Sequence, residues 1–157
     1  MERLTETRTE AGLYELYRRE LTRFATTLVG VTDAADVVSD AMESLLKSGQ
    51  LLEARNPSAL MHRAVFAKAR SMQRSFFRRR ARERRFEQEL VVTHPELRPD
   101  VIAAVIRLSP RQRACIYLTY WEDLAPTQVA DWLDIGVGSV KRHLARARAH
   151  LREDLDA

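Results

Sequence analysis

The residues with the clearest chemistry are basic side chains close to the C-terminus. Four of them recur within a short stretch, and residues 141–152 contain no acid: Lys141, Arg142, Arg146 and Arg148. Guanidinium and ammonium groups bind DNA phosphates and the edges of guanine in the major groove. Four apolar residues alternate with them at spacings of four, three and four: Val140, Leu144, Ala147 and Leu151. This spacing predicts a helix with one buried face and one basic face.

The elements that would position this helix precede it directly. Ser109, Pro110 and Gln112 have the pattern of a helix start, and that helix should run to about Trp121. Pro126 starts a second, short helix. Residues 134–138 interrupt it with two glycines that permit a sharp turn, and the basic helix then begins at Ser139. A short helix, a tight turn and a basic helix form a helix-turn-helix. A three-helix bundle with a solvated basic face is the alternative, and the absence of acids favours DNA binding.

A second basic region lies in the middle of the chain. Residues 62–86 contain ten cationic side chains and one acid, a net charge of +9, with four phenylalanines interleaved. Asn56 and Pro57 start a helix there, which we expect to reach about residue 87 with a possible break near Ser71. Arginines and rings together suit a nucleic-acid surface. Core packing is the alternative for the rings, and we prefer it for Phe76. A membrane-surface helix fits less well, because the charge surrounds the helix.

Two amphipathic helices precede this region. The first ends at Gly30, and we expect Asp33 to cap the second. The outer face of the second helix is polar and acidic, and residues 32–54 contain five acids and one lysine. Such a face is either simply solvated or a docking surface for a partner. We expect a loop over residues 47–55.

Composition limits the class of protein. The 157 residues are 45% hydrophobic with five Gly and five Pro, and no stretch alternates like a strand. We therefore expect an all-α fold of two small helical domains, residues 1–86 and 100–157, joined by a short linker at 87–99. Asp100 should cap the first helix of the second domain. The N-terminus has no signal-peptide core and no apolar run is long enough to cross a membrane, which favours a cytoplasmic protein without membrane insertion.

Catalytic and metal-binding patterns are missing from the sequence. The single cysteine, Cys115, excludes an intramolecular disulfide and a multi-cysteine metal site. No HExxH pattern and no phosphate-binding glycine loop is present, and the four histidines are scattered: His62, His94, His143 and His150. We therefore expect no enzyme activity, no metal and no cofactor.

The C-terminal third resembles a known family. The runs L-S-P-R-Q-R, Y-W-E-D-L and Q-V-A-D-W-L-D-I-G-V-G-S-V-K-R-H-L-A-R-A-R-A-H-L-R resemble the C-terminal domain of bacterial RNA polymerase sigma factors, most closely the extracytoplasmic-function type of the sigma-70 family. The family usually has Ser or Thr at Ala125, Gly at Asp134 and Ser at Gly136. The resemblance implies that this domain binds the upstream, minus-thirty-five promoter element through the following residues: Arg111, Gln128, Gly138, Ser139, Lys141, Arg142, His143 and Arg146.

The N-terminal half resembles the same family less closely. The run D-A-A-D-V-V-S-D-A-M-E-S-L-L-K resembles the helix that docks on core polymerase, which implies contacts by Asp36, Ser39, Asp40 and Glu43. The run N-P-S-A-L-M-H-R-A-V-F-A-K-A-R resembles the helix that reads and melts the minus-ten element. The residues that would do so are Arg63, Phe66, Ala67, Lys68, Arg70, Ser71, Arg74 and Arg78. The family usually has Gln at Ser39, Trp at Leu60, Asn at Ala67 and Asp at Ser71.

The resemblance thus implies a sigma factor that directs core RNA polymerase to promoter DNA, with an anti-sigma factor as a possible partner. Two alternatives stay open. A stand-alone helix-turn-helix regulator would bind an operator without polymerase, although the +9 region has no role in simple dimerisation. A degenerate homologue that acts as an antagonist is compatible with Ala67 and Ser71, because both replace residues where the minus-ten element is read.

Overall fold

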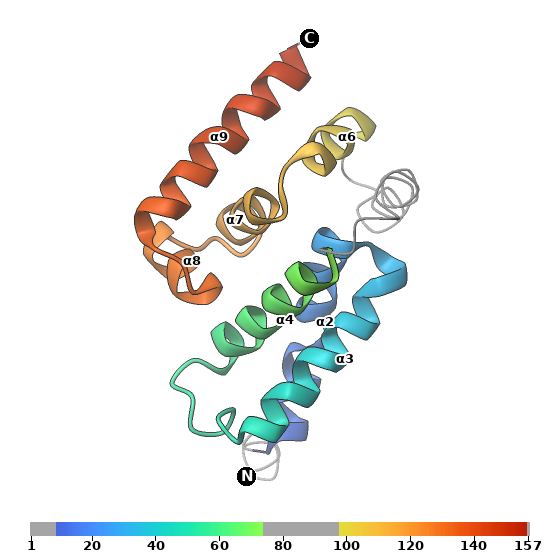
Figure 1. The fold of residues 1–157 in the computed structure, drawn as a ribbon, viewed down its shortest axis with the longest axis vertical. Helices are drawn as coiled ribbons and strands as arrows, with labels where there is room; N and C mark the ends of the chain where they lie inside the picture. Colours follow the sequence, from blue (N-terminus) through green and yellow to red (C-terminus); the bar gives the residue numbers. More distant parts are fainter. Residues whose placement is uncertain (1–8, 74–97, 157) are drawn as a thin grey trace.

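The computed structural model describes residues 9–73 and 98–156, and the regular structure in these ranges is entirely helical (Figure 1). The N-terminal half contains α2 (Glu10–Val29), α3 (Val31–Ser48) and α4 (Pro57–Gln73). The C-terminal half contains α6 (Pro99–Arg107), α7 (Pro110–Tyr120), α8 (Pro126–Leu133) and α9 (Val137–Asp156). The expected all-α fold is confirmed for these ranges. None of their helices is long and apolar enough to cross a membrane.

A single glycine separates α2 from α3. Gly30 has φ 89° and ψ 165°, and its amide donates to the Thr26 carbonyl oxygen while its own carbonyl accepts from Ala34. Only glycine adopts this backbone conformation readily. The predicted end of α2 is confirmed, but the predicted cap at Asp33 is wrong. Because Gly30 reverses the chain within one residue, α3 begins at Val31 without a side-chain cap and Asp33 lies in its first turn.

In the C-terminal half, α6, α7 and α8 each begin at a proline, and no acidic side chain caps them. The Ser109 hydroxyl accepts from the Gln112 amide at 3.2 Å, and the Gln112 side chain accepts from the Ser109 amide at 3.0 Å. This reciprocal pair confirms the predicted start of α7. The predicted cap of α6 at Asp100 is wrong. Pro99 occupies the first helical position, and Asp100 lies one residue further, where it pairs with Arg98.

The turn between α8 and α9 uses an aspartate instead of a glycine. Asp134 has φ 56° and ψ 48°, in the left-handed region, and its amide bonds back to Asp131 and Ala130. Neither Gly136 nor Gly138 has a positive φ. The expectation that these glycines shape the turn is therefore wrong, and α9 begins at Val137 instead of Ser139. A non-glycine residue in this conformation costs on the order of 1 kcal/mol.

The middle of the chain is described only in part. The predicted loop after α3 is confirmed, with Gly49 in the left-handed conformation after Ser48 and with Leu51 buried beneath the helices. α4 passes through Ser71 to Gln73 without the expected break. The predicted continuation of this helix to residue 87 and most of the predicted linker lie outside the described residues.

The two halves share one hydrophobic core. α2 and α4 contact α7 and α8 along an interface that we call the seam (Figure 1). Four rings from the two halves pack there: Phe24 and His62 from the N-terminal half, Tyr117 and Trp132 from the C-terminal half. Ring centroids are 5.5 Å apart for Phe24 and Tyr117 and 4.7 Å apart for His62 and Trp132. Because burial of aromatic rings contributes strongly to packing, these four rings stabilise the seam.

Candidate nucleic-acid interface

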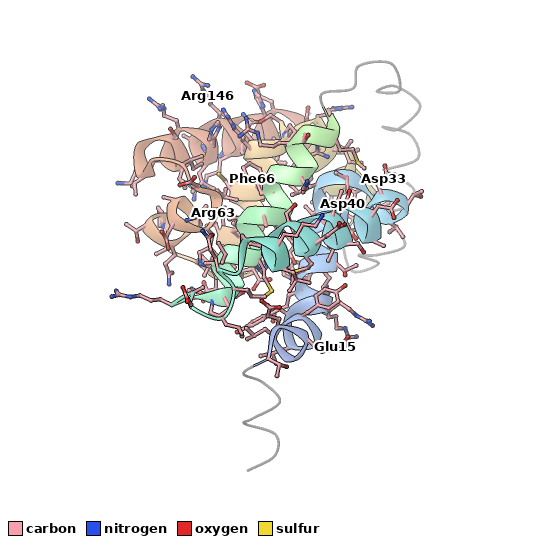
Figure 2. The ribbon with its side chains drawn as sticks, turned by 60° about the horizontal axis from the view of Figure 1, so that its bottom comes forward. Glu15, Asp33, Asp40, Arg63, Phe66 and Arg146 are labelled. Atoms are coloured by element: carbon pink, nitrogen blue, oxygen red, sulfur yellow. The ribbon has the colours of Figure 1, made fainter. Side chains whose placement is uncertain are left out.

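The basic helix α9 has the two faces that its sequence predicts. Val140, Leu144 and Ala147 are buried against the rest of the C-terminal half. The cationic side chains on the opposite face are exposed: Lys141, Arg142, Arg146 and Arg148. Figure 2 shows Arg146 pointing outward from α9. A helix with this distribution can lie in the major groove without disturbing its packing.

Two of these arginines already have partners within the chain. Arg142 donates through Nη2 to the Ser139 hydroxyl at 3.1 Å, one turn earlier on α9. Arg148 donates through Nε to the Tyr120 hydroxyl at 2.8 Å, and its guanidinium lies 5.7 Å from the centroid of that ring. Arg142 is therefore oriented near the start of the helix, whereas Arg148 is fixed to α7. The role of Tyr120 in holding Arg148 could not be read from the sequence.

His143 lies among the cations at the start of α9. Its pKa is lowered from the ordinary value by burial and then by the charges of Arg111, Arg146 and Arg142. Arg111, at the start of α7, is therefore close enough to the basic face of α9 to affect the pKa of His143. A ring with a lowered pKa is largely neutral at pH 7.

The remaining predicted upstream contacts lie around the same helix start. Arg111 and Gly138 are exposed and Ser139 is half-buried. Gln128 is exposed too, but its side-chain oxygen accepts from the Ala125 amide at 2.8 Å. Ala125 has no side-chain oxygen with which to complete a reciprocal cap. The side-chain oxygen of Gln128 is therefore occupied at the start of α8, and its side-chain amide nitrogen can still donate.

The predicted minus-ten residues on α4 divide into two groups. Ala67 and Ser71 are exposed, while Arg63, Lys68 and Arg70 are half-buried. Phe66 is 2% exposed and belongs to the hydrophobic core, with the Arg70 guanidinium 5.7 Å from its ring centroid. The expected stacking of Phe66 on a base is therefore not supported by this arrangement, because core packing occupies the ring. Arg74 and Arg78 lie outside the described residues.

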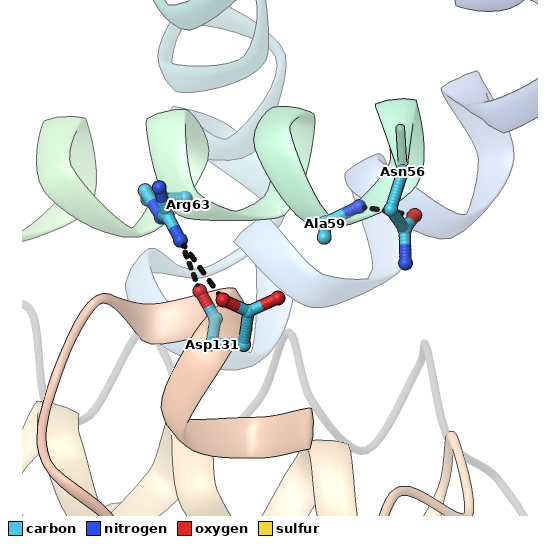
Figure 3. A network of polar contacts seen from close by, with 4 residues as sticks. All are labelled: Asn56, Ala59, Arg63 and Asp131. Carbon is cyan, nitrogen blue, oxygen red and sulfur yellow. Dashed lines mark hydrogen bonds and ion pairs between the residues drawn. The ribbon is translucent and has the colours of Figure 1, made fainter. Parts of the chain in front are cut away.

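Arg63 also makes a contact that crosses the seam. Its guanidinium donates to the backbone carbonyl oxygen of Asp131 in α8 and lies 3.7 Å from the Asp131 carboxylate (Figure 3). At the start of α4, Asn56 accepts from the Ala59 amide at 3.0 Å, which confirms the predicted cap. The Arg63–Asp131 contact joins residues 68 positions apart, so no local sequence signal predicts it.

The outer face of α3 is acidic and accessible. Asp36, Ser39, Asp40 and Glu43 are all exposed, opposite the buried residues Val37, Ala41 and Leu45. Glu43 pairs with Lys47 at 2.9 Å, and this partner lowers the pKa of the glutamate. Asp36 and Asp40 are in no ion pair within the described ranges. Figure 2 labels Asp40 on the exposed face of α3, with the half-buried Asp33 near the start of the same helix.

Comparison with known proteins identifies the C-terminal half. Residues 99–151 match the protein family described as Sigma-70, region 4. RNA polymerase sigma-E factors of Streptomyces avermitilis and Streptomyces coelicolor are 40% and 42% identical to this chain over 50 residues, which is 32% of the chain. These matches span only 28% of the relatives' own length.

A solved structure extends the comparison to the fold. The sigma factor RpoE from Bartonella quintana, crystallised with the anti-sigma factor NepR, matches with a TM-score of 0.65 and 22% sequence identity. The match covers 92% of this chain and 94% of that one. Residues 99–151 thus resemble region 4 of the sigma-70 family, and the chain as a whole has a fold similar to that of a solved sigma factor.

Proposed function

We propose that the protein is a sigma factor, which binds core RNA polymerase and directs it to promoters. The observation that carries this proposal is the exposed basic face of α9, with no acid in residues 141–152, within a segment that matches sigma-70 region 4. In this role the protein performs no reaction of its own, since polymerase makes the RNA. The division of labour follows the predicted domains, with residues 1–86 for polymerase and the minus-ten element and residues 100–157 for the upstream element.

The two proposed surfaces have opposite charge. The acidic face of α3 would dock on polymerase through Asp36, Ser39, Asp40 and Glu43, and electrostatic complementarity would steer that encounter. The basic face of α9 would enter the major groove, with Arg142 and Lys141 nearest the base edges. Because core polymerase and promoter DNA are cytoplasmic in bacteria, we place the protein there. An anti-sigma factor is a third proposed partner, supported by the complex in which the Bartonella quintana relative was solved.

The proposal is tested by reversing charge on the acidic face. We expect Asp36→Lys with Asp40→Lys to leave the melting curve close to that of the parent, because exposed acids contribute little to folding. The same variant should no longer co-purify with core polymerase. Its affinity for upstream-element DNA should not fall, because α9 is untouched. A matched control is Glu15→Lys with Glu153→Lys, two exposed acids on α2 and α9 with the same total change in charge.

Other outcomes separate the alternatives. If the parent chain never binds core polymerase but binds DNA, the stand-alone regulator is the better explanation. If it binds core polymerase but supports no run-off transcription from any genomic fragment, it is an antagonist. If the control loses polymerase binding as the α3 variant does, the loss is due to the total charge of the protein and not to the acidic face of α3.

A further inference from the structure

A histidine and two glutamates from three separate elements converge at the seam. Glu20 lies on α2, His62 on α4 and Glu122 just after α7. One nitrogen or oxygen atom from each side chain lies within 4.8 Å of the other two. Two of these residues come from the N-terminal half and one from the C-terminal half. Their separation in sequence explains why the sequence predicts no metal site.

The His62 ring has one unprotonated nitrogen, and it is buried. Its Nδ1 lies 2.7 Å from the Ser58 carbonyl oxygen, which can only accept, so Nδ1 carries the proton. With the proton on Nδ1, Nε2 holds a lone pair. The side chain is 0% exposed, and Nε2 has no hydrogen-bond partner in the described part of the chain. A buried acceptor without a partner costs about 1–3 kcal/mol.

The two carboxylates add negative charge to the same cluster. The Arg23 guanidinium lies 5.0 Å from the centroid of the Trp121 ring. A lone pair and two carboxylates thus lie close together, and one cation bound between them would give all three a partner.

We propose that Glu20, His62 and Glu122 bind one divalent transition-metal ion of the Zn²⁺ class, which joins the two halves across the seam. One imidazole with two carboxylates suits Zn²⁺, Co²⁺ or Ni²⁺ better than Ca²⁺ or Mg²⁺, which prefer all-oxygen ligands. The Nδ1–H bond from His62 to the Ser58 carbonyl is the outer contact that metal-bound histidines make. Three protein ligands leave a fourth position for water.

The geometry requires only a small adjustment. Ligand atoms about 2.1 Å from a tetrahedral ion lie about 3.4 Å from one another. The donors at the seam lie within 4.8 Å of one another, so they must close by at most about 1.4 Å. Glu20 is exposed and Glu122 is half-buried, so both side chains can move, whereas His62 is held by Ser58 and by the Phe24 and Trp132 rings. The fixed imidazole would receive the ion, and the carboxylates would close on it.

The experiment uses the full chain without added histidines, stripped of metal by a chelator. Co²⁺ is added while visible absorption is recorded, and Zn²⁺ affinity is measured by competition with a chromogenic chelator. We expect one equivalent of each ion to bind and Zn²⁺ to raise the melting temperature, because an ion that binds only the folded chain stabilises it. Glu20→Gln with Glu122→Gln should lower affinity by about 100-fold or more, given that loss of outer contacts alone costs 10–100-fold.

The control is Glu15→Gln with Glu153→Gln, which removes the same charge from exposed positions elsewhere. It should bind the metal as the parent does. Because Glu20 is exposed, Glu20→Gln alone keeps the test available if the double variant fails to fold in chelator. The proposal is overturned if the parent gives no Co²⁺ absorption and no Zn²⁺-dependent melting shift. It is equally overturned if the Glu20→Gln chains and the control bind with the same affinity. The site does not depend on the proposed function.

Discussion

Arg63 of α4 is bound to Asp131 of α8, through the Asp131 backbone carbonyl and through a carboxylate 3.7 Å away. The same arginine is a predicted contact for the minus-ten element. In the arrangement described here it therefore cannot face DNA and α8 at once. In the proposed function, exchange of Asp131 for DNA as the partner of Arg63 would link the seam to promoter binding.

Asp131→Ala should favour the DNA-bound state of Arg63. Both side chains are partly exposed, so the ion pair is worth at most about 1 kcal/mol. We expect affinity for minus-ten DNA to rise by up to roughly 5-fold, measured by fluorescence anisotropy. Asp134→Asn removes the same charge nearby and keeps a residue that tolerates the left-handed turn. Equal gains in the two variants would mean that charge alone, and not the contact with Arg63, is responsible.

Gly30 and Gly138 should respond in opposite ways to alanine. Gly30 has φ 89° and ψ 165°, a conformation that costs an L-residue roughly 1–3 kcal/mol. We expect Gly30→Ala to lower the free energy of unfolding by about that amount in urea titrations. Gly138 has no positive φ and no heavy atom within 4 Å of an added Cβ. Gly138→Ala should therefore be neutral or stabilising by up to ~1 kcal/mol. A Gly30→Ala chain as stable as the parent would contradict this account of the α2–α3 junction.

Arg142→Ala should impair recognition of the upstream element. The side chain is exposed in the second turn of α9, where Ser139 orients it. Loss of a good base contact costs roughly 1–3 kcal/mol of binding free energy. Arg152→Ala removes the same charge near the far end of the helix and should have a smaller effect. If Arg142→Ala weakens cognate and scrambled DNA equally, Arg142 contacts phosphate and not bases.

Binding of upstream DNA should tighten as the pH falls. The pKa of His143 is lowered in the free protein by burial and by three neighbouring arginines. DNA phosphates would partly neutralise those arginines and favour the charged ring, so the bound state takes up protons and affinity rises below the ordinary histidine pKa of about 6.5. We expect a few-fold tighter binding at pH 6 than at pH 7.5. His143→Gln should abolish this difference, and His150→Gln should not. A pH dependence that survives in His143→Gln assigns the proton to another group.

The sequence predicts those features whose signals are local. The reciprocal bonds of Ser109 and Gln112 and the apolar stripe of α9 depend on residues a few positions apart, and both are confirmed. The caps proposed at Asp33 and Asp100 are wrong, because Gly30 and Pro99 set the helix starts by backbone geometry. The buried state of Phe66, the Arg63–Asp131 contact and the Glu20–His62–Glu122 cluster depend on how the halves pack. Residue spacing within a few helical turns does not predict contacts between residues so far apart in the sequence.

The seam also gives this protein a natural optical signal. Its sequence contains two tryptophans, and both lie at the seam. Trp132 packs on His62 with ring centroids 4.7 Å apart, and Trp121 lies beneath the Arg23 guanidinium of α2. Trp132 is buried and Trp121 is partly exposed, so separation of the halves would transfer mainly the Trp132 indole to water and shift its emission to longer wavelength. Intrinsic fluorescence would therefore report any separation of the halves, in the free protein or on DNA, without a label.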